Sequence, residues 1–137
     1  MNTPKADVYS FGGSKRIVGM ALRKYKISRG RVVILSKCYA GIPNPGDLHG
    51  LSAQEQLVQL AVTDGIMVIR MGLSRKHIFD AVEASVERLD TYIDVLQIHR
   101  LDRETPREQI MKALNDVVES GKVRYIDASS VCDPGQF

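Results

Sequence analysis

YIDVLQIHRLDRETPREQIMKALNDVVESGKVRYI, residues 92–126, is the most informative segment of this chain for its architecture. It opens with a mostly apolar run, Tyr92–Ile98, which is typical of a strand covered on both faces, as in a parallel sheet. A helical pattern follows between Thr105 and Gly121, and residues 123–126 return as a strand. The order strand, helix, strand predicts a βα unit with a right-handed crossover.

The helix of this segment has clear start and stop signals. Thr105-Pro106-Arg107-Glu108 is typical of a capping box with proline at the first helical position, and Gly121 is a typical stop. A second helical pattern begins at Ser74 and continues to Leu89.

A third helix is predicted from about Ser14, as its cap, to Tyr25. In this helix we expect Ile17, Val18, Ala21, Leu22 and Tyr25 to face the core and Lys15, Arg16, Arg23 and Lys24 to face solvent.

The remaining pattern is weaker. Val32-Val33-Ile34-Leu35 predicts another buried strand, and a short strand is expected before Tyr9. Residues 41–47 are rich in Pro, Gly, Asn and Asp and predict an exposed loop. Residues 52–61 have a weak helical pattern, and the short apolar run 66–69 fits either a strand or a helix.

These alternating elements predict a parallel α/β sheet, either open or closed into a barrel. The chain has 137 residues, which is one domain, residues 1–137, and too short for a complete eight-stranded barrel of about 250 residues. Hydrophobic residues make up 44% and charged residues 26% of the chain, an ordinary globular composition.

Charge and targeting signals exclude several classes of protein. The net charge is only +3, with no basic arm, so nucleic-acid binding is not expected. No run approaches the roughly 20 apolar residues of a membrane span, and the first residues form no secretory signal. Cys38 and Cys132 have no metal-ligand spacing and are expected as reduced thiols. We therefore expect a cytoplasmic protein without a metal site.

Glycine-rich nucleotide motifs are also missing. Gly41 and Gly46 have the spacing of a phosphate loop, but Asp47 stands where the lysine belongs, and no G-x-G-x-x-G follows a strand. A small open sheet that binds some phosphate ligand is therefore the weakest of the alternatives.

Polar residues gather at the expected ends of strands, where ligands bind in parallel sheets. They are Tyr9, Lys37, His99, Ser129 and Ser130. Each alone has an ordinary explanation, such as a turn tyrosine, a solvent lysine, a boundary histidine or a helix cap. Together they permit carbonyl reduction, because an ammonium lowers the pKa of a nearby tyrosine and a neutral imidazole can orient a carbonyl oxygen. A reduced cofactor would supply the hydride.

Several segments resemble aldo-keto reductases, most closely the fungal aryl-alcohol-dehydrogenase-like branch. They are residues 6–10, the helix opening Gly13-Ser14, and residues 33–37, 72–78, 96–100 and 121–130. The resemblance covers nearly the whole chain outside residues 42–70. It implies part of a TIM-type (β/α)8 barrel, roughly strands 2 to 5, that binds NADPH.

The resemblance also implies roles for single residues. Tyr9 matches the family's proton donor, Lys37 the residue that lowers its pKa, and His99 the residue that orients the carbonyl. Ser129 and Ser130 match the pair that contacts the nicotinamide carboxamide. The expected reaction is NADPH-dependent reduction of a small aldehyde or ketone to an alcohol.

Pro4-Lys5-Ala6 stands where the family has Asp-Thr-Ala, so the fourth catalytic residue, an aspartate, is missing. We expect this change and the truncation to impair turnover. The alternative is a non-catalytic, truncated family member that acts as a binding or interaction protein. An incomplete barrel has open sheet edges, so self-association is expected.

Overall fold

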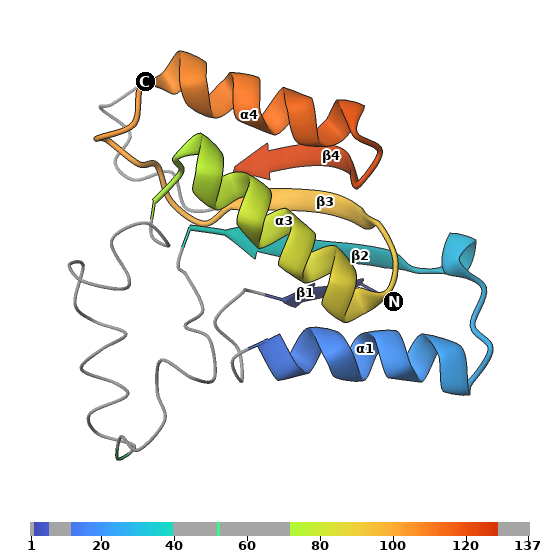
Figure 1. The fold of residues 1–137 in the computed structure, drawn as a ribbon. Helices are drawn as coiled ribbons and strands as arrows, with labels where there is room; N and C mark the ends of the chain where they lie inside the picture. Colours follow the sequence, from blue (N-terminus) through green and yellow to red (C-terminus); the bar gives the residue numbers. More distant parts are fainter. Residues whose placement is uncertain (1, 6–11, 40–51, 53–71, 129–137) are drawn as a thin grey trace.

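Four parallel strands form one sheet in the order β1-β2-β3-β4 (Figure 1). The computed structural model describes residues 2–5, 12–39, 52 and 72–128. The strands are β1 (Asn2–Lys5), β2 (Val33–Cys38), β3 (Ile93–Ile98) and β4 (Val123–Ala128). Because all strands are parallel, their carboxyl ends lie at the same edge of the sheet. The predicted parallel α/β sheet is confirmed.

Three α-helices connect the strands: α1 (Gly13–Lys24), α3 (Arg75–Leu89) and α4 (Arg107–Glu119). A short 3-10 helix, η2 (Arg29–Arg31), precedes β2. Helix α3 packs on β2 and lies between α1 and α4, so the three helices form one layer (Figure 1). Among the described helices, none has the length and apolar character needed to cross a membrane.

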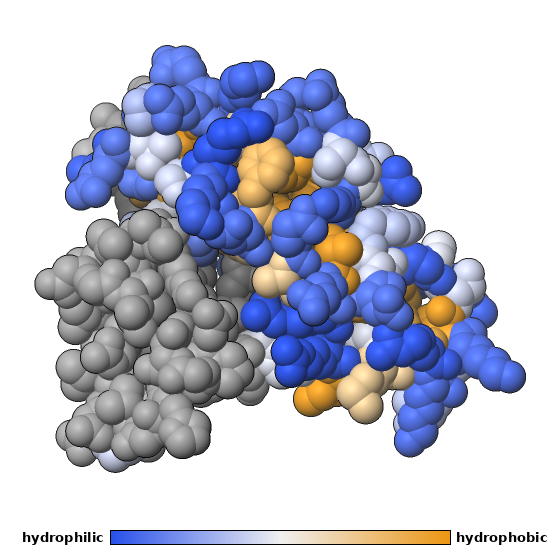
Figure 2. Space-filling model, in the orientation of Figure 1, coloured by the Kyte–Doolittle hydropathy of each residue, from blue (hydrophilic) through white to orange (hydrophobic). Residues whose placement is uncertain are grey.

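The core lies between this helical layer and the sheet. In β2, Ile34, Ser36 and Cys38 are buried, whereas the alternate residues are more exposed. Ile34 and Cys38 belong to the same buried cluster as Ile78 and Val82 of α3. The strand β2 therefore presents one face to the helices and the other face, with Lys37, to the opposite side. In the view of Figure 2 the surface of the described part is mostly hydrophilic, with separate apolar patches.

Helix α1 packs along a face that matches the predicted one only in part. Val18 and Leu22 pack against the core as expected. Lys15 is buried, with 1% of its surface exposed, and its Nζ donates to Ser85 Oγ at 2.6 Å, so the expectation that it faces solvent is wrong. Ile17 and Tyr25, expected in the core, are 67% and 68% exposed. The reason is Gly19, because a Cβ at this position would lie 2.5 Å from the Leu89 carbonyl oxygen. A residue without a side chain sets the contact face and allows the two helices to approach closely.

Two predicted helix starts differ from the structure. The capping box at Thr105 is wrong, since Pro106 is the N-cap of α4 and no side chain caps it. The Thr105 hydroxyl instead donates to Asp102 Oδ2 at 2.7 Å. Helix α1 begins after Gly12, whose φ of 79° is in the left-handed region, so Ser14 lies inside the helix and is not its cap.

The start of α3 is as predicted. Ser74 is its N-cap, and its hydroxyl accepts a hydrogen bond from the His77 backbone N–H at 3.2 Å. The predictions for residues 41–47 and 66–69, and all but Ser52 of those for residues 52–61, lie outside the described residues.

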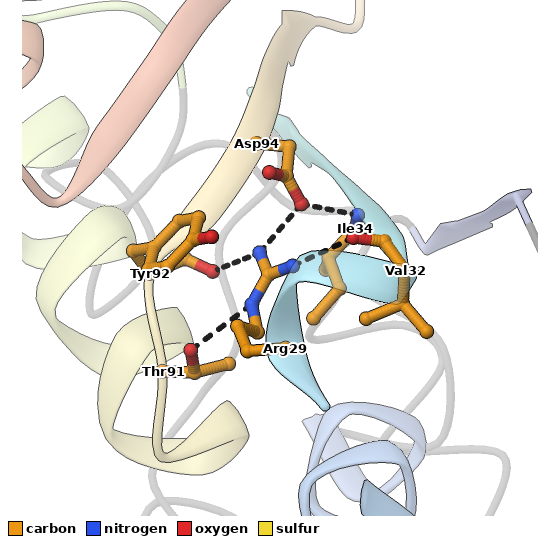
Figure 3. Close-up of polar contacts among 6 residues, drawn as sticks. All are labelled: Arg29, Val32, Ile34, Thr91, Tyr92 and Asp94. Atoms are coloured by element: carbon orange, nitrogen blue, oxygen red, sulfur yellow. Dashed lines mark hydrogen bonds and ion pairs between the residues drawn. The ribbon is translucent and has the colours of Figure 1, made fainter. Parts of the chain in front are cut away.

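A network around Arg29 joins the amino ends of β2 and β3 (Figure 3). Its guanidinium donates to Thr91 Oγ1 at 3.0 Å, to the Val32 and Tyr92 carbonyls at 2.8 Å each, and to Asp94 Oδ2 at 2.5 Å. Asp94 Oδ2 also accepts from the Ile34 backbone N–H at 2.7 Å. Arg29 therefore fixes the two central strands to each other at the edge opposite the predicted site.

Candidate active site

Lys37 and His99 lie at the carboxyl edge of the sheet on neighbouring strands. Lys37 is in register with Gln97 near the end of β2, and His99 directly follows β3. The His99 backbone N–H donates to the Cys38 carbonyl at 2.9 Å, which fixes its position against β2. Both side chains are half-buried. The structure thus brings together two of the five predicted site residues.

The other three, Tyr9, Ser129 and Ser130, lie outside the described residues. Their roles remain predictions. Ser129 follows directly on Ala128, the last residue of β4.

A polar row crosses the sheet at this edge. Lys37 of β2, Gln97 of β3 and Asp127 of β4 are successive register partners. Gln97 Nε2 donates to Asp127 Oδ2 at 2.7 Å, and the Ala128 N–H donates to Asp127 Oδ1 at 2.8 Å. The hydrogen bond from Gln97, followed by that from Ala128, lowers the pKa of Asp127 below its usual value. Asp127 is therefore a carboxylate at neutral pH.

The loop after β3 is fastened by Asp102. Its carboxylate accepts hydrogen bonds from the Leu73 N–H at 2.8 Å, from the Glu104 N–H at 2.9 Å and from the Thr105 hydroxyl. Partial burial alone would raise the pKa of Asp102, but the hydrogen bonds outweigh burial and lower it. Asp102 therefore ties the loop that follows His99 to the chain that enters α3.

A cavity opens beside the same loop. It has a volume of about 460 Å³ and is lined by Leu101, Asp102, Arg103, Thr105, Pro106 and Arg107. The Gly72 N–H donates to the Tyr39 carbonyl at 2.9 Å, which joins the chain after β2 to the chain before α3. The Arg100 guanidinium lies 5.2 Å from the centre of the Tyr39 ring. These contacts involve the segments that follow β2 and β3, the strands that carry Lys37 and precede His99.

Sequence reasoning did not assign a role to Gln97 or to Asp102. Gln97 lies within an apolar strand, and its bond to Asp127 spans 30 positions of the chain. The one signal in the sequence was Asp127 itself, because a charged residue is unusual in an otherwise apolar strand end.

Comparison with known proteins decides the family. A model of the aldo/keto reductase family matches residues 5–132, which is most of the chain. The chain belongs to the aldo/keto reductase family. Among the curated members, a versiconal hemiacetal acetate reductase of Aspergillus parasiticus is 63% identical over 127 residues, which cover 92% of this chain and 35% of that protein. A putative aryl-alcohol dehydrogenase of Schizosaccharomyces pombe is 51% identical over 126 residues, or 38% of its length.

The chain thus spans a little over a third of the length of these aldo/keto reductases. A solved aldo-keto reductase of Bacillus halodurans, in its holo form, superposes with a TM-score of 0.69 at 24% identity, over 97% of this chain and 37% of that one. This likeness shows the fold. The four strands and their helices are part of a (β/α)8 barrel, and the resemblance to the fungal aryl-alcohol-dehydrogenase-like branch is confirmed.

Proposed function

We propose that this chain carries the catalytic edge of an NADPH-dependent reductase that converts aldehydes or ketones to alcohols. The main support is the position of Lys37 and His99 on adjacent strands at the carboxyl edge of the sheet in a member of this family. In barrels of this type, catalytic groups come from the carboxyl ends of several strands.

The chemistry follows from the residue types. The Lys37 ammonium stabilises the phenolate of Tyr9 and so lowers the pKa of the phenol toward the range useful for proton donation. Tyr9 donates its proton to the carbonyl oxygen of the substrate, and His99, as a neutral imidazole, orients that oxygen. The hydrogen bond from the His99 backbone N–H to the Cys38 carbonyl fixes the backbone that carries the imidazole beside β2.

On the family resemblance, we assign Ser129 and Ser130, which follow β4 in the chain, to the carboxamide of a reduced nicotinamide. Asp127, two residues before Ser129, is an exposed carboxylate near the same end of β4. When bound, NADPH supplies the hydride.

The substrate class is a small molecule with a carbonyl group. Two relatives are named a hemiacetal acetate reductase and an aryl-alcohol dehydrogenase, and both names describe chemistry at the carbonyl or alcohol level. We propose a cytoplasmic enzyme that self-associates. Exposed apolar side chains on α1 and β4, including Ile17, Met20 and Tyr125, support the self-association.

A second candidate is a non-catalytic binding protein. It is favoured by the composition of β1, whose residues Asn2–Lys5 contain no carboxylate, with Pro4 at the position that the family resemblance gives to the catalytic aspartate. The first candidate predicts that the chain reduces carbonyl substrates, and the second predicts that it does not.

The deciding experiment uses the full chain and its Tyr9→Phe variant. We expect saturable NADPH binding, followed by cofactor fluorescence, in both proteins. With a panel of aldehydes, we expect Tyr9→Phe to lower substrate-dependent NADPH oxidation by about 100-fold or more, because the proton donor is lost. Tyr125→Phe is the matched control, since Tyr125 is 71% exposed on β4 and takes no part in the mechanism. Equal turnover in Tyr9→Phe would end the proposal, and no turnover in the wild-type chain would support the second candidate.

A further inference from the structure

The described sheet and the helical layer on it each have two outer sides. The strand order makes β1 and β4 the edge strands of the described sheet, and α3 lies between α1 and α4. Helix α1 lies on the β1 side of the layer and α4 on the β4 side (Figure 1). In a closed (β/α)8 barrel, strands and helices have neighbours on both sides. The outer sides of α1 and α4 are therefore where the described elements would meet a partner.

The outer side of α1 carries exposed apolar side chains. Lys15 and Gly19 face α3. At about 3.6 residues per turn, Ile17 lies on nearly the opposite side of the helix, with Met20 beside it at the i+3 position. They are 67% and 61% exposed, and Figure 2 shows apolar side chains at the lower edge of the molecule, over α1. An apolar strip of α1 thus faces away from the helical layer.

The outer side of α4 carries an apolar side chain as well. Leu114 is buried against the sheet side, and Asp116 pairs with Arg75 of α3. Met111 lies on the remaining side of the helix and is 55% exposed. Both outer helices therefore present apolar surface away from α3.

The edge strand β4 is exposed on both faces. Its residues are exposed from Arg124 onward. Tyr125 and Ile126 follow each other in the strand, so their side chains point to opposite faces, and they are 71% and 37% exposed. Parallel strands are normally covered on both faces. The β4 edge therefore has the character of a strand that adds a neighbour.

The charges of the two outer helices decide which sides can pair. Helix α4 has three carboxylates against two cations, and Glu108 lies one turn before Met111, next to Arg107. Asn115, one turn after Met111, donates to Glu119 at 2.9 Å. In α1 every charged residue is basic, namely Lys15, Arg16, Arg23 and Lys24. Two α1 helices therefore repel each other, whereas α1 of one copy and α4 of another attract.

Pairing of α1 with α4 closes after two copies. All four strands are parallel, so a two-fold axis along the strands keeps every strand parallel and places β4 of each copy beside β1 of the other. Two described sheets supply the eight strands of a barrel, and the chain superposes on part of a solved barrel. A contact that closes in this way ends in a dimer and not in a filament.

We propose that two copies of this chain associate side by side into one closed (β/α)8 barrel. The outer side of α1 of each copy packs against the outer side of α4 of the other. This inference rests on the self-association in the proposed function and gives it a partner, a surface and a symmetry.

Sedimentation velocity of the full chain, without cofactor or substrate, tests this arrangement. We expect one species with twice the 15.2 kDa of a single chain. Ile17→Glu places a carboxylate opposite the acidic α4, and Met111→Lys places a cation opposite the basic α1. Each should raise the dissociation constant of the dimer at least about 10-fold. The double variant Ile17→Glu/Met111→Lys brings opposite charges together at both contacts and should restore the dimer, which also shows that the substitutions do not prevent folding.

Glu87→Lys is the matched control, because Glu87 is exposed on the middle helix α3, and it should leave the dissociation constant unchanged. The mass of a single chain, or an assembly that grows with concentration without a fixed mass, would overturn the inference. A dimer that Met111→Lys leaves intact, or that the control weakens equally, would overturn it too and leave self-association through another surface. Turnover is not measured here, so a failure of the reductase proposal in the Tyr9→Phe experiment is a separate result.

Discussion

Asp94 and Asp127 occupy opposite ends of the same sheet and are used in different ways. Asp94 is 18% exposed and accepts hydrogen bonds from a guanidinium and from the backbone of β2. Asp127 is exposed and accepts from the neutral amide of Gln97 and from the backbone of the residue that follows it. The amino edge neutralises its carboxylate with a guanidinium in a fixed network, whereas the carboxylate at the carboxyl edge is met by a neutral amide and by a backbone N–H.

This division matches the general design of parallel barrels. Residues at the amino edge stabilise the barrel, and residues at the carboxyl edge carry the chemistry. In this chain the contrast can be tested, because substitutions in the Arg29 network should lower the free energy of unfolding more than substitutions in the loops at the carboxyl edge.

The largest effect is expected at the amino edge, for Arg29→Ala. This change removes the hydrogen bonds to Thr91, Val32 and Tyr92 and leaves the half-buried Asp94 carboxylate without its cation. The free energy of unfolding, measured by urea denaturation, should fall by about 3 kcal/mol.

Arg23→Ala is its control. Arg23 and Asp90 form an ion pair in which both side chains are more than half exposed, at 56% and 68%. Its loss should cost less than about 1 kcal/mol. If the two variants are equally stable, Arg29 does not fix the strands as described.

A smaller effect is expected where the loops of the carboxyl edge meet. Gly72 has a φ of 84°, and a Cβ there would lie 2.6 Å from Asp102 Oδ2. Gly72→Ala should lower the free energy of unfolding by about 2 kcal/mol, because it adds backbone strain and displaces Asp102. Gly30→Ala is the matched control, since a Cβ at Gly30 meets no atom within 4 Å. Similar thermal midpoints for the two variants would contradict this explanation.

The smallest effect concerns the pH dependence of stability at Asp102. Its pKa is lower in the folded chain than the ordinary aspartate value near 3.8. The carboxylate therefore contributes stability that is fully present above about pH 4 and is lost as the pH falls through the folded value. Asp102→Asn should lower the free energy of unfolding by about 1 kcal/mol at pH 7, after allowance for solvent screening.

Urea denaturation of both proteins at several pH values checks this expectation. The difference in stability between the wild type and Asp102→Asn should shrink below pH 4. A difference that stays constant from pH 7 to pH 3 would show that the hydrogen bonds act independently of the charge of Asp102.

Local patterns were sufficient to predict the order of elements. Apolar runs predicted β2 and β3, the Ser74 cap predicted α3, and the strand ends placed Lys37 and His99 at one edge. These features depend on near neighbours in the chain. Helix packing and the polar row do not, because they depend on contacts between distant segments.

The packing prediction for α1 that the structure contradicts failed because of a contact between segments that are distant in the chain. The periodicity of α1 favoured Ile17 as a core residue, but the close approach of Gly19 to Leu89 turned Lys15 inward. The predicted cap of α4 was the Thr105 hydroxyl, but this hydroxyl donates to Asp102 Oδ2 and does not cap the helix. The bond between Gln97 and Asp127 required the register of β3 and β4, which no local pattern specifies.

The hydrogen bond between Gly72 and Tyr39 also bears on the length of the chain between them. The chain leaves β2 at Tyr39 and returns beside the same residue, so the two ends of the intervening segment are held together. The entropic cost of joining two points of a chain grows slowly with the number of residues between them, by about 0.6 kcal/mol for each doubling. A chain of different length between Tyr39 and Gly72 can therefore end at the same hydrogen bond and leave the ends of β2 and β3 in place.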